Sequence, residues 1–210
     1  MSKRLSASQR RAQLIDVGRS VFARNGYEGT SVEEIARAAG VSKPIVYQHF
    51  GGKVGLHAVI VDREMEYVVQ RVAEAIAIGT PRERFQGAVL AFLNYVKAHP
   101  DGFVVLTRDA PSTVGPGMNS VISDLGERIG VIFEAEFEKA GMEPRVAPIY
   151  AHALIGMVTS TGQWWLDQSS NYPVDEVAAH VAALGWMGLR HLPKAPDPLP
   201  AQPSTPETNT

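Results

Sequence analysis

One stretch near the N-terminus constrains the fold of this chain more than any other: AAGVSKPIVYQHFGGK, residues 38–53. A short helical pattern ends there at Gly40, which can adopt the left-handed backbone conformation that often terminates a helix. Val41 can then plug the corner, and Ser42 can cap a new helix that tolerates Pro44 in its first turn. The sequence therefore predicts two short helices joined by a tight turn.

Helical spacing of apolar side chains continues along the rest of the chain, and no alternating run bounded by hairpin signals indicates a strand. We expect helices over residues 8–25, 31–40, 42–50, 53–78, 81–98, 122–141, 146–168 and 173–191, with a further short segment at 103–110. The prediction is an all-α fold of about nine helices.

The same pattern divides the chain into three parts. Residues 1–52 hold the tight helical pair and the helix before it, and residues 53–192 hold the longer helices. Residues 193–210 contain many prolines and few apolar side chains, which is typical of a disordered tail. We therefore expect two folded domains followed by a Pro-rich tail.

Composition excludes several classes of protein. The 210 residues include no cysteine, which rules out disulfides and thiolate metal sites. No apolar run approaches the roughly 18 residues that a membrane span needs, and no apolar segment of a secretory signal follows the basic N-terminus. We expect a soluble, cytoplasmic protein that does not contact membranes.

Charge is distributed unevenly along the chain. Residues 1–63 carry ten lysines and arginines against five acids, a net +5, whereas the whole chain carries -2 and the remainder therefore -7. A basic N-terminal part on an acidic body indicates a polyanionic partner at one end. Chance clustering of charges on a solvated surface is the alternative interpretation, which the charge pattern favours less.

The helix at residues 42–50 carries side chains that suit a DNA duplex. Val46 and Phe50 are spaced to face a core, which leaves Lys43, Ile45, Tyr47, Gln48 and His49 outside. Lysine, tyrosine and histidine can bind phosphate, glutamine can read an adenine edge, and isoleucine can touch a thymine methyl. Lys53, at the start of the next helix, is placed for another phosphate. We predict that this helix enters the major groove of double-stranded DNA.

The segments VFARNGYEG and TSVEEIARAAGVSKPIVYQHFGGK, within residues 12–56, resemble the N-terminal domain of the TetR family of transcriptional regulators. The resemblance implies a homodimer on a near-palindromic operator and a C-terminal domain that binds a small effector. It also implies DNA contacts by these residues: Thr30 or Ser31, Ser42, Lys43, Tyr47, His49 and Lys53. The helix-turn-helix domain is then residues 1–52, and the effector-binding and dimerisation domain is residues 53–192.

This chain departs from the pattern of the family at two positions. Ile45 stands where a small polar residue is common, and Gly52 replaces the usual Ser or Asn cap of the next helix. The first change bears on base preference and the second on local stability. Arg10 and Arg11 precede the first helix as basic arms do, and we expect them to add phosphate contacts.

Large apolar side chains are spread over the helices that surround the cavity in this family, with almost no charge among them. They are Phe85, Phe92, Tyr95, Phe103, Met118, Phe133, Met157 and Trp164. An apolar pocket favours a hydrophobic effector, such as an acyl chain or an aromatic drug-like compound. An equally strong interpretation is that these side chains form only a core.

The last two helices are rich in alanine and glycine, which permit close approach of helices, and we expect them to form the dimer interface. The six histidines form no close metal-ligand pair and no nucleophile motif is present, so we expect no metal, cofactor or catalytic residue. The leading interpretation is a repressor released by its effector. The alternatives are an activator of the same fold, and a helical carrier or enzyme whose DNA-binding domain has decayed.

Overall fold

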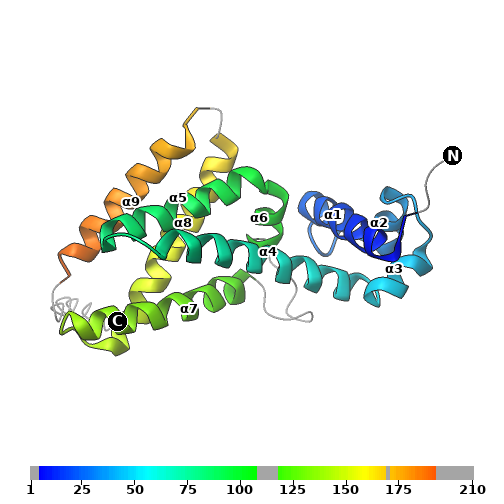
Figure 1. Ribbon diagram of the computed structural model, residues 1–210. Coiled ribbons are helices and arrows are strands. Elements are labelled where there is room, and N and C mark those ends of the chain that lie inside the picture. Colours follow the sequence, from blue (N-terminus) through cyan, green and yellow to red (C-terminus); the bar gives the residue numbers. More distant parts are fainter. Residues whose placement is uncertain (1–4, 108–117, 169–170, 193–210) are drawn as a thin grey trace, which may run out of the picture.

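The computed structural model describes residues 5–107, 118–168 and 171–192. Within these ranges the chain forms nine α-helices and one 3₁₀ turn, so the predicted all-α fold is confirmed there (Figure 1). The elements are α1 (Ala7–Asn25), α2 (Val32–Ala38), α3 (Lys43–Phe50), α4 (Lys53–Ile76), α5 (Pro81–Ala98), α6 (Pro100–Thr107), α7 (Met118–Lys139), η1 (Pro144–Val146), α8 (Ala147–Gln168) and α9 (Val174–Arg190). The Pro-rich tail expected at 193–210 lies outside the described residues.

The first three helices pack around a small core that includes part of α4. Leu14 of α1, Ile35 of α2 and Val46 of α3 are fully buried together, as are Leu56 and Ile60 of α4. These side chains are the apolar stripes of their helices, and burying each of them contributes roughly 1.5–3 kcal/mol. The core therefore fixes the positions of α2 and α3 relative to α1.

Two glycines make the turns around α3 possible. Gly40 has φ 64°, the left-handed conformation expected at the corner between α2 and α3. Gly52 has φ 126°, and a Cβ there would lie 3.2 Å from Cε1 of Tyr47. Both positions favour glycine for its backbone, so the absent Ser or Asn cap before α4 follows from the geometry of the turn.

The larger domain contains α5 to α9 and the second half of α4. Leu93 and Val96 of α5, Phe103 of α6 and Trp165 of α8 are buried in its core. Trp165 also donates from Nε1 to the carbonyl oxygen of Tyr172 at 2.8 Å, which satisfies its one polar atom. No helix in the described part of the chain is long and apolar enough to cross a membrane.

The two cores share α4 and α6, which run between them (Figure 1). Along α4, Ile60 belongs to the first core and Val68 to the second. On α6, Val105 packs in the first core whereas Phe103 and Leu106 pack in the second. The helix expected at 103–110 begins earlier, directly after α5, because Pro100 suits a first helical position. The boundary proposed at residue 52 therefore separates helices that remain packed together.

Candidate nucleic-acid interface and ligand cavity

The exposed face of α3 carries most of the predicted nucleic-acid contacts. Ser42, Lys43, Tyr47 and Gln48 are exposed, and the hydroxyl of Ser42 makes no cap hydrogen bond. Val46 is fully buried, as its spacing predicts. Ile45 and His49 are half-buried, and Ile45 packs partly against the first core. Serine, lysine, tyrosine and glutamine therefore lie together on a surface that a duplex could reach.

Side chains of α1 hold both helices of the tight pair at their C-terminal ends. Arg11 donates from Nη1 to the backbone oxygen of His49 at 3.1 Å, and its guanidinium lies 4.5 Å from the ring centroid of Phe50. Gln13 donates from Nε2 to the backbone oxygen of Ala39 at 3.2 Å. The expected basic arm is wrong, because Arg10 and Arg11 lie inside α1 and Arg11 fixes α3 from within the domain.

Lys43 forms an exposed ion pair with Glu33 of α2, which joins the two helices across the turn. The hydrogen bond from the ammonium to Glu33 and the charge of that carboxylate raise the pKa of Lys43. The ammonium also lies 5.8 Å from the ring centroid of Tyr47. Lys43 is therefore placed on the surface of α3, but a phosphate would have to compete with Glu33 for it.

Thr30 and Ser31, the two alternatives for a phosphate contact before α2, lie in different environments. Thr30 is only 3% exposed, and its hydroxyl donates to the backbone oxygen of Gly26 at 2.7 Å. Ser31 is exposed and its side chain accepts from the backbone N–H of Glu34 at 3.2 Å, as an N-cap does. Burial removes Thr30 from a surface role, which leaves Ser31 as the candidate.

Lys53 is tied into the domain instead of projecting freely. Its Nζ donates to the backbone oxygens of Tyr27 at 2.9 Å and Thr30 at 3.0 Å, and lies 4.1 Å from the ring centroid of Tyr27. These bonds use two of its three N–H groups and fasten the start of α4 to the segment between α1 and α2. One donor is left for a phosphate.

The larger domain contains a cavity of about 440 Å³ between α4, α5, α7, α8 and α9. Its lining is almost entirely apolar, with Arg84, Glu136 and Thr159 as the main polar members. The apolar lining comprises Val72, Ile76, Pro81, Phe85, Ala88, Val89, Phe92, Ile129, Phe133, Phe137, Ala140, Met142, Leu154, Ile155, Val158, Trp186, Leu189 and Leu192. A cavity of this size and polarity suits a small hydrophobic ligand.

The structure brings three of the eight predicted lining residues to this cavity: Phe85, Phe92 and Phe133. Four others lie elsewhere, because Tyr95 and Phe103 are buried in the core, Met157 packs beside it, and Trp164 is half exposed. The side chain of Met118 lies outside the described residues. Large apolar residues on a helix divide between core and cavity according to the face they occupy, which residue type alone does not reveal.

Several other residues that line the cavity could have been predicted from the sequence. Val89 continues the stripe of Phe85 and Phe92, and Ile129 and Phe137 continue the stripe of Phe133 at helical spacing. Extending each stripe along its helix would have found them. Trp186 and Leu189 carried no such signal, because the small residues of their helix pointed to a dimer interface.

The alanines and glycines of α8 and α9, which were expected at a dimer interface, are mostly buried within the larger domain. Ala147, Ala151, Ala178 and Ala182 are at most 4% exposed. The exposed apolar side chains of α8 and α9 are instead Ile149, Trp164, Leu184 and Met187, which are between 50% and 68% exposed. Small residues here serve the packing of the domain itself, and a different face of these helices is open.

Among residues 5–107, 118–168 and 171–192, no group of three or more histidines and acids is placed to hold a metal ion.

Two family models match the chain. Residues 14–60 match the model described as bacterial regulatory proteins, tetR family, and residues 81–188 match the model described as tetracyclin repressor-like, C-terminal domain.

Individual relatives agree with these matches. The HTH-type transcriptional activator FasR of Mycolicibacterium smegmatis is 28% identical over 191 residues, which cover 90% of this chain and 87% of FasR. The crystal structure of a TetR-like transcriptional regulator from Rhodococcus sp. RHA1 aligns with a TM-score of 0.74 and 29% identity, over 90% of this chain and all of the other. The fatty acid degradation regulator FadR from Bacillus halodurans shares the fold, with a TM-score of 0.72 and 19% identity over the same shares.

Proposed function

Because the chain belongs to the TetR family of bacterial transcriptional regulators, we propose that it is a repressor that a small hydrophobic effector releases from a near-palindromic operator. The observation that carries the proposal is the presence, in one chain, of an exposed polar face on α3 and an apolar cavity in the larger domain. The relatives are regulators and not enzymes, and the intact α3 surface argues against a carrier with a decayed DNA-binding domain.

On DNA, we assign Ser31, Ser42, Lys43, Tyr47, His49 and Lys53 to phosphate and Gln48 and Ile45 to base edges. Exposure supports Gln48 most directly, because a bidentate amide needs an open path to an adenine. Loss of such a contact should cost about 1–3 kcal/mol on the operator and little on unrelated DNA.

The effector we propose is an amphiphile with an acyl chain. Its chain would lie along Phe85, Phe92 and Phe133, where burial of each methylene contributes about 0.8 kcal/mol, roughly fourfold in affinity. Arg84 lines the same cavity, is exposed and forms no ion pair with the described residues. A guanidinium in that position favours a carboxylate head over an uncharged one.

Fluorescence anisotropy tests the proposal with a duplex from the region upstream of the protein's own gene and a shuffled duplex of equal length. The protein should prefer the first, Gln48→Ala should remove most of that preference, and dodecanoate should release the complex more effectively than hexanoate or dodecanol. Equal binding to both duplexes, or release that does not depend on chain length, would contradict it.

The sign of regulation is a separate question, because the relative FasR is named as an activator. Transcription in vitro from the same upstream region distinguishes the two cases. Repression predicts less transcript when the protein is added and recovery with dodecanoate, whereas activation predicts the reverse.

For assembly, we propose a homodimer through the open face of α8 and α9. Ile149 and Trp164 of α8 and Leu184 and Met187 of α9 expose apolar area that a symmetric partner would cover. Ala183 and Gly188 lie exposed on α9 beside them and allow close approach of a second helix.

A further inference from the structure

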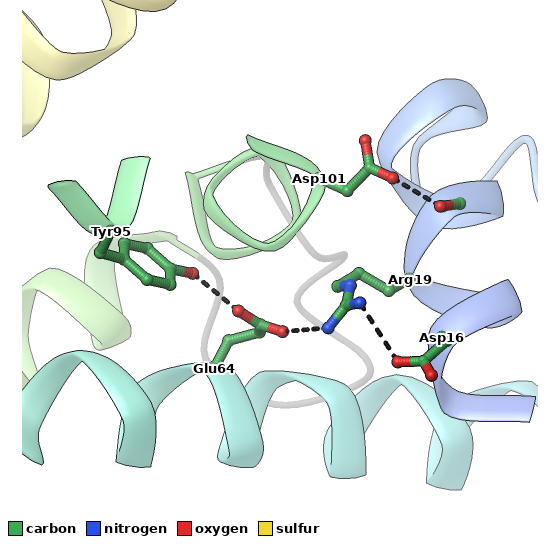
Figure 2. Close-up of polar contacts among 6 residues, drawn as sticks. Asp16, Arg19, Glu64, Tyr95 and Asp101 are labelled. Carbon is green, nitrogen blue, oxygen red and sulfur yellow. Dashed lines mark hydrogen bonds and ion pairs between the residues drawn. The ribbon is translucent and has the colours of Figure 1, made fainter. Parts of the chain in front are cut away.

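A buried carboxylate lies where the two domains meet. Glu64 of α4 is only 5% exposed, yet it accepts from Nη1 of Arg19 at 2.7 Å and from the hydroxyl of Tyr95 at 3.0 Å. Figure 2 shows it between the two, with Arg19 reaching from α1 on one side and Tyr95 from α5 on the other. One side chain thus joins the DNA-binding domain to the effector domain by polar contacts.

Stability is a weak explanation for such a group. Burying an ion pair costs about as much desolvation as it gains in attraction, and apolar replacements are often no less stable. The network is complete, since Arg19 also pairs with Asp16 at 3.2 Å and no buried side-chain nitrogen or oxygen of the described residues lacks a hydrogen-bond partner. A complete polar network fixes a particular arrangement of the helices that carry it.

Helix α6 holds the same network from a third direction. A Cβ on Gly102 would lie 2.2 Å from Oε2 of Glu64 and 3.0 Å from the hydroxyl of Tyr95, so the backbone of α6 closes over the carboxylate. One residue earlier, Asp101, which is labelled in Figure 2, accepts a hydrogen bond. The donor is the hydroxyl of Ser20 of α1, at 2.5 Å. A shift of α5 or α6 would therefore change the contacts of α1.

The cavity reaches this network through Phe92. That ring lines the cavity, lies 6.4 Å between centroids from the ring of Tyr95, and packs edge-on against Phe103 of α6 at 6.0 Å. On the other side, α1 holds the ends of α2 and α3 through Gln13 and Arg11. The contacts run without a gap from the cavity wall to the DNA-binding surface.

The protonation states of the two donors are secure. Burial, followed by the negative charge of Glu64, raises the pKa of Tyr95 far above its ordinary value, so the phenol remains a donor. Burial opposes the charge of Arg19, but its hydrogen bond to Glu64 and the charge of that carboxylate raise its pKa overall. Tyr95 and Arg19 therefore both keep the protons that they donate to Glu64 near neutral pH.

We propose that Glu64, held between Arg19 and Tyr95, is the coupling residue through which filling of the cavity at Phe92 repositions α1 and weakens DNA binding. This inference rests on the proposed function, because it requires that an effector occupies the cavity. An occupant that moves Phe92 moves Tyr95, and Glu64 and Arg19 must then rearrange because a buried carboxylate cannot be left unpaired.

The test is Tyr95→Phe, which removes only the hydroxyl and keeps the ring packed. Anisotropy gives the operator Kd with and without saturating dodecanoate, and the ratio of the two is the coupling factor. We expect the Kd for operator alone and the Kd for dodecanoate alone to stay within about threefold of their wild-type values. The coupling factor should fall at least tenfold, or to one where the wild-type factor is below about ten. Dodecanoate binding measured with and without operator must show the same loss, because coupling is reciprocal.

Tyr67→Phe is the matched control. Tyr67 lies beside Tyr95, with ring centroids 6.0 Å apart, but its hydroxyl makes no hydrogen bond to the described residues. This variant should keep the wild-type coupling factor. A Tyr95→Phe variant that kept the wild-type factor, or a Tyr67→Phe variant that lost it equally, would overturn the proposal.

A second measurement does not depend on the effector. Phe92→Leu reshapes the cavity wall, and its effect on operator Kd should shrink to nothing when Tyr95→Phe is also present. Additive effects of the two substitutions would overturn the coupling role. If dodecanoate fails to release the wild-type protein, the proposed effector is wrong, and this cycle still decides whether Glu64 couples the two domains.

Discussion

At the scale of single residues, exposure and existing partners separate side chains that the sequence treats alike. The sequence placed Lys43 and Lys53 together as phosphate ligands, but one pairs with a surface acid and the other bonds two backbone oxygens. Spacing could predict that Val46 faces the core, because periodicity defines a face. It could not predict that Thr30 is buried, because burial depends on how the whole domain packs. Nor could it predict that Lys53 fastens a loop, because the backbone oxygens of Tyr27 and Thr30 that it bonds lie 26 and 23 residues away in sequence.

The ion pair on the α3 surface leads to a prediction for Glu33→Gln. If Lys43 binds phosphate as proposed, Glu33 competes with that phosphate and its negative charge repels the duplex. Its neutralisation should then strengthen binding to operator and shuffled DNA alike, by roughly threefold to tenfold at low salt. The salt slope should steepen by about 0.9 per subunit. Anisotropy titrations at salt concentrations from about 50 to about 200 mM measure both quantities, because affinity for DNA changes strongly over that range.

Glu66→Gln serves as the control for that variant. Glu66 is exposed on α4 and forms no ion pair with the described residues, so the same loss of charge there should change DNA binding little. An equal gain from both variants would mean that total charge, and not the Glu33–Lys43 pair, governs the affinity.

At the scale of the helices, most of the fold could be predicted from sequence. Capping residues, glycines and apolar stripes placed eight of the nine described helices within a few residues, because each of these signals is local. The exception is α6, which begins at Pro100 and not at Phe103, because a proline that ends one helix can also start the next. Which stripe faces the cavity depends on how α4, α5, α7, α8 and α9 pack against one another, and no local signal contains that information.

The contact between α1 and α4 leads to a prediction about pH. His57 of α4 is 7% exposed and packs edge-on against the rings of Phe22 and Tyr27, at 5.0 and 4.9 Å. Burial, together with the nearby charge of Lys53, lowers the pKa of His57. The folded protein therefore resists a proton that the unfolded chain accepts at its ordinary pKa of about 6.5.

Stability should accordingly be constant with respect to His57 above that pH and fall as the pH drops below it. The slope from this residue is at most one proton, about 1.4 kcal/mol per pH unit, and it ends once the folded state also binds the proton. Urea unfolding of wild type and His57→Phe at a series of pH values measures this, with the exposed His180→Gln as control. A fall of equal steepness in His57→Phe would assign the effect to other groups.

At the scale of the whole molecule, function depends on arrangements that no single helix specifies. The family resemblance covered residues 12–56 and correctly predicted a DNA-binding regulator, yet the link from cavity to DNA-binding surface uses Arg19, Glu64 and Tyr95, three residues far apart in sequence. In sequence Glu64 is one acid among many on an amphipathic helix. Only packing shows that it is buried, and that α4 and α6 belong to both cores.

Assembly of two such molecules leads to the last prediction. Leu184 of α9 is 68% exposed in the single chain, so each subunit of Leu184→Glu should fold with little loss of stability. In a dimer formed through α8 and α9, the new carboxylate would be buried without a partner, which costs about 3–5 kcal/mol and weakens association more than 100-fold. Operator binding should weaken with it, because two half-sites then no longer bind as one unit. Sedimentation velocity at micromolar concentration distinguishes monomer from dimer directly.

Ile78→Glu is the control, because it introduces the same charge at an exposed apolar residue outside these helices and should leave the dimer intact. A Leu184→Glu variant that sedimented as a stable dimer would place the interface on another face.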